Sequence, residues 1–111
     1  MKSPEHCVVY ITAGSEEEAA RIAELLVVGR LAACVARVGP VHSVYRWKGA
    51  VESATEVLLI AKTRMACFGA LRKAVLEAHS YEVPEIVAIP LAGGEQAYLD
   101  WIDENTACEH E

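Results

Sequence analysis

The sequence predicts an α+β domain of the ferredoxin-like class, with the order β-α-β-β-α-β followed by a C-terminal helix. Three observations lead to this prediction. Short β-branched runs alternate with two segments whose apolar residues recur at helical spacing. Two long extended runs flank Gly49-Ala50, as in a β-hairpin. No internal repeat is detectable, so we expect one antiparallel sheet with a long hairpin.

The chain opens with a predicted strand and helix. Residues 7–12 are β-branched and aromatic, which is typical of a strand with both faces covered. Ser15 and Glu18 have the spacing of a capping box and start a helix. Gly29 is expected to end that helix in the left-handed conformation. The acidic residues 16–18 complement the helix dipole, and we interpret them as a solvated helix start.

A long hairpin is predicted for the middle of the chain. Residues 31–48 read as one strand, interrupted at Gly39-Pro40 by a bulge or kink. In its second half Tyr45 and Trp47 lie on the same side, because side chains alternate along a strand. The return strand over residues 51–62 ends in an apolar run. The aromatic tip is therefore expected to project from the domain.

The remaining elements complete the order. Thr63 is predicted to cap a second helix that ends at His79. A fourth strand follows over residues 83–91, and residues 95–105 form a terminal helix that packs through its aromatic and aliphatic side chains. We expect residues 106–111 to be a flexible tail.

Length and composition indicate a single domain that oligomerises. The 111 residues suit one domain over 1–111, with an ordered core of about 7–105. Hydrophobic residues make up 53% of the chain. Two helices of a ferredoxin-like unit cover only one face of the sheet, yet the strands are apolar on both faces. Another copy of the chain is expected to cover the second face.

Charge and cysteine usage exclude several classes of protein. Ten basic against sixteen acidic residues give a net charge of −6, with no basic run, so nucleic acid is not an expected partner. No apolar run is long enough to span a membrane, and the N-terminus lacks the apolar region of a signal peptide. We expect a cytoplasmic location. The four cysteines, without a C-x-x-C pair, are interpreted as reduced thiols, with Cys7 and Cys67 packed in the core.

A polar corner joins the second helix to the fourth strand. This 79–86 corner reads His-Ser-Tyr-Glu-Val-Pro-Glu-Ile. Pro84 forces Val83 out of the helical region, so the segment is a stiff turn that carries an imidazole, a phenol and two carboxylates. Polar groups on a rigid turn are suited to binding. The alternative is a polar loop with a hydrogen-bonded histidine.

Over residues 7–102 the chain resembles the divalent-cation tolerance (CutA) proteins. The resemblance is carried by five motifs in sequence order: Leu31-Ala32-Ala33-Cys34-Val35, Ser43-Val44-Tyr45-Arg46-Trp47-Lys48-Gly49, Lys62-Thr63, the 79–86 corner and Tyr98-Leu99-Asp100-Trp101. It implies a compact homotrimer of ferredoxin-like subunits, similar in architecture to the PII signalling proteins. Two positions depart from the family. Ser80 replaces a usual proline, which should leave the corner less rigid, and Ala13 replaces a cysteine that is linked to copper in some bacterial members.

The implied clefts between subunits are the first candidate site. Aromatic walls with a few placed charges suit a small ligand. The candidate residues are Tyr45, Trp47, Lys62, His79, Tyr81 and Glu85. Alternatively, Tyr45 and Trp47 anchor the trimer interface, and Lys62 forms an ion pair with a carboxylate such as Glu56 or Glu85.

A metal site is the second candidate. Thiolate with imidazole suits copper or zinc, and Cys34 with His79 is the candidate pair. Further candidates are Glu82, Glu85, Cys108 and His110. No spacing among them is a ligand signature. No cofactor is expected to be required, and copper or another divalent cation is the candidate ligand. The alternative is a buried Cys34 and a tail that chelates metals only loosely.

Catalysis is not expected. His79 beside Tyr81 and Glu85 could act as a general acid or base, but the sequence has no nucleophile elbow, phosphate loop or H-E-x-x-H motif. The sequence therefore favours a non-enzymatic, cytoplasmic trimer in divalent-cation (copper) tolerance, which binds metal ions or a small ligand as a PII-like signalling module. The alternative is a structural trimer that displays a surface for a partner protein and binds metals incidentally.

Overall fold

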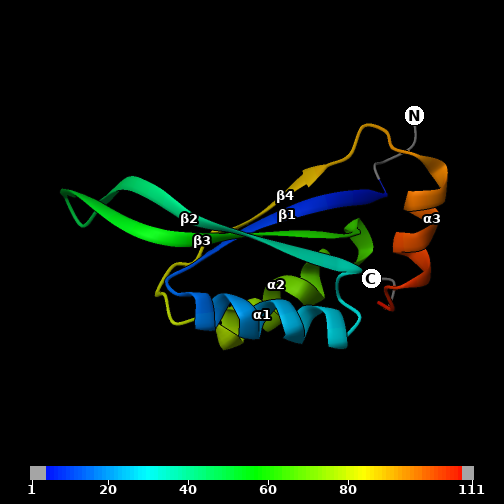
Figure 1. Cartoon of the computed structure of the whole chain (residues 1–111), viewed down its shortest axis with the longest axis horizontal. Coiled ribbons are helices and arrows are strands. Elements are labelled where there is room, and N and C mark those ends of the chain that lie inside the picture. The colour runs from blue at the N-terminus through cyan, green and yellow to red at the C-terminus, as the bar shows by residue number, and fades with distance from the viewer. Residues whose placement is uncertain (1–4, 109–111) are drawn as a thin grey trace.

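The computed structural model describes residues 5–108 and has the predicted ferredoxin-like order (Figure 1). The antiparallel sheet has the strand order β2-β3-β1-β4. Its strands are β1 (His6–Ala13), β2 (Cys34–Trp47), β3 (Ala50–Arg64) and β4 (Ile86–Pro90). The helices are α1 (Glu16–Val28), α2 (Phe68–Ala78) and α3 (Gln96–Glu104), with a 3-10 turn at Met65–Cys67. None of the described helices is long and apolar enough to cross a membrane.

The hairpin of β2 and β3 extends well beyond the rest of the domain (Figure 1). Its pairing runs from Cys34 opposite Lys62 to Trp47 opposite Ala50, with a register shift between Val38 and Val41, as the bulge prediction required. At the tip, two residues with positive φ, Lys48 and Gly49, give the turn that matches the twist of paired strands.

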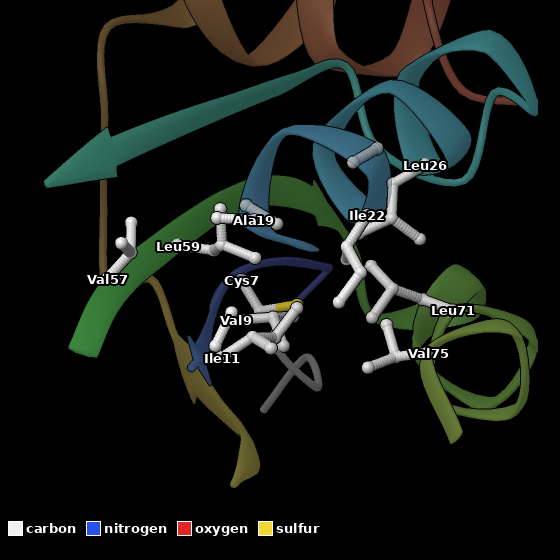
Figure 2. Packing of buried hydrophobic residues seen from close by; sticks show 13 residues of the cluster. Cys7, Val9, Ile11, Ala19, Ile22, Leu26, Val57, Leu59, Leu71 and Val75 are labelled. Atoms are coloured by element: carbon white, nitrogen blue, oxygen red, sulfur yellow. The ribbon is translucent and has the colours of Figure 1, made fainter. Parts of the chain in front are cut away.

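The core lies between one face of the sheet and helices α1 and α2. Alternate residues of β1 are fully buried, as its two-residue period requires. Figure 2 shows side chains of β1, β3 and both helices pointing toward one another. The labelled members of this cluster are Cys7, Val9, Ile11, Ala19, Ile22, Leu26, Val57, Leu59, Leu71 and Val75.

The opposite face of the sheet is apolar and, within residues 5–108, no helix covers it. Figure 1 shows α1 and α2 on one side of the sheet and α3 beyond its end. We call this surface the open face, and its side chains are Val8, Tyr10, Ala36, Val38, Leu58, Ile60, Val87 and Ile89. Val87 and Ile89 are 47% and 42% exposed. The predicted excess of apolar surface is therefore present.

The end of the first helix is confirmed in place but not in conformation, and the start of the second helix is wrong. α1 ends at Val28 with Gly29 as its C-cap, as predicted, but Gly29 has an ordinary φ of −77° and the left-handed residue is Arg30, with φ of 59°. Thr63 lies inside β3, where its hydroxyl donates to the carbonyl of Leu31 at 2.7 Å, so it does not cap a helix. The strand continues past Thr63 because Thr63 and Arg64 pair with Cys7 and His6 of β1. As a result α2 begins only at Phe68.

The cysteine and tail predictions are also corrected. Cys67 and Cys108 form a disulfide, with their Cα atoms 5.2 Å apart, so only Cys7 and Cys34 are free thiols. Thr106 is buried, and its hydroxyl accepts a hydrogen bond from Arg64 Nε at 2.7 Å. Residues 106–108 are thus fastened beside the start of α2, because α3 brings the chain back there. The predicted tail residues 109–111 lie outside the described part of the chain.

Strand β4 and helix α3 are shorter or less buried than predicted. β4 begins at Ile86 because residues 83–85 belong to the corner. On α3 only Ile102 is fully buried. Tyr98 and Trp101 are 43% and 39% exposed and stack on each other, with ring centroids 5.5 Å apart.

Candidate functional site

A groove of about 490 Å³ lies where the hairpin meets the 79–86 corner. We call it the hairpin groove. Its lining comes from β1, β2, β3 and the corner, and comprises Thr12, Ser43, Val44, Tyr45, Trp47, Glu52, Glu56, Tyr81, Glu82, Val83 and Glu85. A volume of this size suits a small-molecule ligand.

The hairpin supplies one wall through its strand pairing. Tyr45 lies directly opposite Glu52, and Val41 lies opposite Glu56. Cross-strand partners point to the same face, so the aromatic side chains of β2 and the carboxylates of β3 share that wall. Since β3 continues from Glu56 to Leu58, the groove adjoins the open face of the sheet.

His79 fixes the corner rather than lining the groove. Its side chain is fully buried. Nε2 donates to the carbonyl of Thr12 at 2.7 Å, while Nδ1 accepts the backbone N–H of Tyr81 at 3.1 Å. These two contacts define a neutral ring with both nitrogens in use. The imidazole therefore positions Tyr81, whose ring lies 4.7 Å from it.

Glu18 ties the start of α1 to the corner. Its carboxylate accepts the backbone N–H of Ser80 at 2.7 Å and that of Gly14 at 3.3 Å. Burial alone would raise the pKa of Glu18, but the hydrogen bonds from Ser80 and Gly14 outweigh burial, and the pKa is lowered. Glu18 was predicted to be solvated, and this is wrong because the corner covers it. Its position in the acidic run gave no sign of that contact.

Glu56 is the most buried carboxylate of the groove. It is 8% exposed, and its Oε2 accepts the Tyr81 hydroxyl at 2.7 Å. Burial, this hydrogen bond and the charge of Glu56 raise the pKa of Tyr81 above its ordinary value. The predicted ion pair between Lys62 and Glu56 or Glu85 does not form, because Lys62 Nζ lies near Cys34 Sγ, at 3.9 Å. Among residues 5–108, no basic side chain comes within 4.0 Å of Glu56.

The structure brings together most of the predicted cleft. Tyr45, Trp47, Tyr81 and Glu85 line the groove, whereas Lys62 and His79 do not. Sequence reasoning missed Glu52 and Glu56 as lining residues. Side chains alternate along both strands of a hairpin, and counting outward from the predicted turn could have placed both glutamates on the same side as the aromatic side chains.

The predicted metal ligands do not converge. Cys34 lies opposite Lys62 of β3, whereas His79 contacts Thr12, which lies opposite Leu58 of β3. Positions 58 and 62 are four residues apart along this strand, which corresponds to about 13 Å. Among residues 5–108, no three His, Cys, Asp or Glu side chains are placed to hold one ion. Glu82 and Glu85 line the groove, Cys108 is bonded to Cys67, and His110 lies outside the described residues. The metal site at Cys34 and His79 stays a prediction, without a ligand set that supports it.

The fold and the groove define a class: a ferredoxin-like domain with a projecting hairpin above a polar corner. Comparison with known proteins gives the family. The family described as CutA1 divalent ion tolerance protein matches residues 7–105. The divalent-cation tolerance protein CutA of Thermus thermophilus is 52% identical over 99 residues, covering 89% of this chain and 96% of that protein. The chain therefore belongs to the CutA1 divalent ion tolerance family.

Solved structures agree with this assignment. The Thermus thermophilus protein superimposes with a TM-score of 0.90 at 50% identity, covering 92% of this chain and 99% of that one. A CutA from Archaeoglobus fulgidus, described as periplasmic, gives a TM-score of 0.88 at 48% identity, covering 90% of this chain and 97% of that one.

The Arabidopsis thaliana relative, described as chloroplastic, is 42% identical over 89% of this chain and 54% of its own length. Relatives are thus described from different compartments.

Proposed function

We propose that this chain acts as a non-enzymatic homotrimer in divalent-cation tolerance, and that it binds a cation or small ligand in the hairpin groove as a PII-like signalling module. The observation that carries the proposal is Glu56. A buried carboxylate without a basic partner among the described residues faces a groove of ligand size. Such a charge is costly unless something positive approaches it.

The open face supports the homotrimer. Its apolar side chains would lose contact with water if other copies packed against them. Because the groove adjoins the open face, a neighbouring subunit would border it. The groove would then lie between subunits, like the cleft that the resemblance to the CutA proteins implies.

The state of His79 supports a non-enzymatic role. A general base needs a free lone pair and a general acid needs a proton that it can release to a substrate. Here one ring nitrogen accepts from Tyr81 and the other donates to Thr12. The residue therefore holds the corner in place.

Copper and a cytoplasmic location remain part of the proposal, each with its own test. Copper is the candidate among divalent cations, to be compared directly with zinc. The Cys67–Cys108 disulfide is typical of oxidising compartments, which argues against the cytoplasm. Alkylation of thiols in intact cells before extraction tests this: two free cysteines per chain support an oxidising compartment, and four support the cytoplasm.

The alternative function is a structural trimer that displays a surface for another protein. The stacked, partly exposed Tyr98 and Trp101 on α3 favour this alternative, since such aromatic side chains are common at interfaces. A binding module shows saturable, groove-dependent ligand binding, whereas a scaffold does not.

Calorimetric titration of copper(II) and zinc into the full-length protein tests the proposal, with sedimentation equilibrium to give the assembly mass. The groove variant is Glu56→Gln, and the matched control is Glu77→Gln, on an exposed position of α2. Saturable binding that is weakened only by Glu56→Gln supports the proposal. A monomeric mass, or a trimer that saturably binds neither ions nor small molecules, overturns it.

A further inference from the structure

We propose that the hairpin groove takes an organic cation, a compound with an ammonium or guanidinium group on a short apolar body. This inference rests on the proposed binding function of the same groove and names the class of its ligand. Three features of the groove lead to it: its charge, its aromatic walls and the arrangement of its carboxylates.

The lining is strongly acidic. Four carboxylates border the groove, those of Glu52, Glu56, Glu82 and Glu85, and no Lys, Arg or His is among the lining residues. Lys48 Nζ approaches Glu82 at 3.8 Å, and both side chains are about 70% exposed. A concave site with one sign of charge attracts the opposite charge. The groove therefore favours cations over neutral or anionic ligands.

Glu56 gives this charge a defined position. It is 92% buried, being 8% exposed, and its only side-chain hydrogen bond among the described residues is from Tyr81 to Oε2. Its other oxygen, Oε1, has no hydrogen-bond donor there. Oε1 is accessible to solvent, because no fully buried side-chain oxygen of the described residues lacks a partner. A donor with a positive charge can therefore reach it from the groove and complete its coordination.

The aromatic walls favour an organic cation. Tyr45, Trp47 and Tyr81 line the groove, and ammonium and guanidinium groups are attracted to aromatic faces. Lys48 provides an example within the chain: its ammonium lies 5.5 Å from the Trp47 ring centroid and also approaches Glu82. The groove offers a similar combination of ring and carboxylate to a ligand cation at Tyr45, which lies directly opposite Glu52.

The arrangement of carboxylates disfavours a bare metal ion. A tight metal site needs several ligands around one point, and within residues 5–108 no three candidate ligands converge. The four groove carboxylates instead surround a space of about 490 Å³. A molecule of several atoms can span from one carboxylate to another, whereas a single ion cannot.

Calorimetric titration of the assembled, full-length protein with 1,4-diaminobutane tests the inference. The neutral control is 1,4-butanediol, which has the same chain length, and the anionic control is succinate. We expect saturable binding of the diamine that weakens with added salt, and none of either control. Glu56→Gln and Trp47→Leu should each weaken diamine binding about tenfold or more, and Glu77→Gln should leave it unchanged.

Several outcomes overturn the inference. It fails if the diamine does not bind, if the diol binds equally well, or if Glu56→Gln and Glu77→Gln bind the diamine alike. Zinc binding at the groove without diamine binding removes this inference but leaves the proposed function intact. If no cation and no small molecule binds the groove, both this inference and the proposed function fail. Glu56→Gln keeps an acceptor for Tyr81, and if it does not assemble, Glu85→Gln and Trp47→Leu provide the same comparison.

Discussion

At the scale of single residues, Glu18 joins parts of the chain that are far apart in sequence. Its carboxylate binds the N–H groups of Gly14, after β1, and of Ser80, after α2. Each of these hydrogen bonds favours the charged form, which is why the pKa is lowered despite burial. Folding and ionisation of this group are therefore linked.

Glu18 should make stability depend on acid pH. Its folded pKa lies below the ordinary value of 4.5, so the stabilisation is fully present above that value and is lost as the pH falls through the folded pKa. Glu18→Gln should lower the free energy of unfolding at neutral pH by about 1–3 kcal/mol and flatten its acid dependence. Urea unfolding across acidic pH measures both effects. Glu17→Gln, at an exposed position, is the control, and the prediction fails if both variants keep the wild-type slope.

Ser80 should stabilise the corner through its backbone, contrary to the expectation that losing the family's proline loosens it. Ser80 N–H donates to Glu18 Oε2 at 2.7 Å, and proline has no N–H to donate. Ser80→Pro should therefore destabilise the protein by about 1–2 kcal/mol. Hydrogen exchange at the Tyr81 amide should become faster. Slower exchange would show that proline stiffens the corner more than the hydrogen bond does.

At the scale of elements, the disulfide closes a loop of 41 residues between the start of α2 and the end of the described chain. Cys67→Ser combined with Cys108→Ser should lower the free energy of unfolding by up to about 4 kcal/mol, because a loop of this length restricts the unfolded chain. Cys34→Ser, at a free thiol, should have a small effect. Thiol titration of the denatured, unreduced wild type should find two thiols per chain, and four would contradict the pairing.

The order of the elements could be predicted from the sequence, whereas some boundaries could not. The β-branched run at residues 7–12 and the cap at Ser15 are local signals, and the structure confirms the strand and the cap. Thr63 was misassigned because its hydroxyl contacts Leu31, 32 residues away. The Cys67–Cys108 pairing likewise depends on where α3 returns the chain. Contacts between segments that are distant in sequence produce no periodic pattern in the sequence from which they could be predicted.

The groove could be predicted only in part. The cleft itself was expected from the resemblance to the CutA proteins, while strand alternation placed Tyr45 and Trp47 on one side and Pro84 marked the stiff turn that carries Tyr81 and Glu85. Which side chains of the corner face inward depends on tertiary packing. His79 turned toward Thr12 rather than toward a ligand, and no sequence pattern specifies that choice.

At the scale of the whole molecule, the open face should hold the assembly together. Ile60 lies in its centre, between Tyr10 and Ala36 in the sheet. If the chain forms the proposed homotrimer through this face, Ile60→Glu should reduce the sedimenting mass to that of a monomer, since burying a carboxylate in an apolar interface is costly. Val28→Glu, at a position 76% exposed on α1, should leave the mass unchanged. An unchanged mass for Ile60→Glu would contradict assembly through this face.

The covalent link between Cys67 and Cys108 also restricts how copies of the chain can exchange parts. The closed ring contains α2, the corner, the edge strand β4 and α3. Edge strands and terminal helices are segments that proteins readily trade between subunits. Because β4 and α3 both lie inside one covalent ring, neither is a free terminal segment that one copy of the chain could donate by itself. In the oxidised protein, exchange of these two elements between copies is therefore restricted.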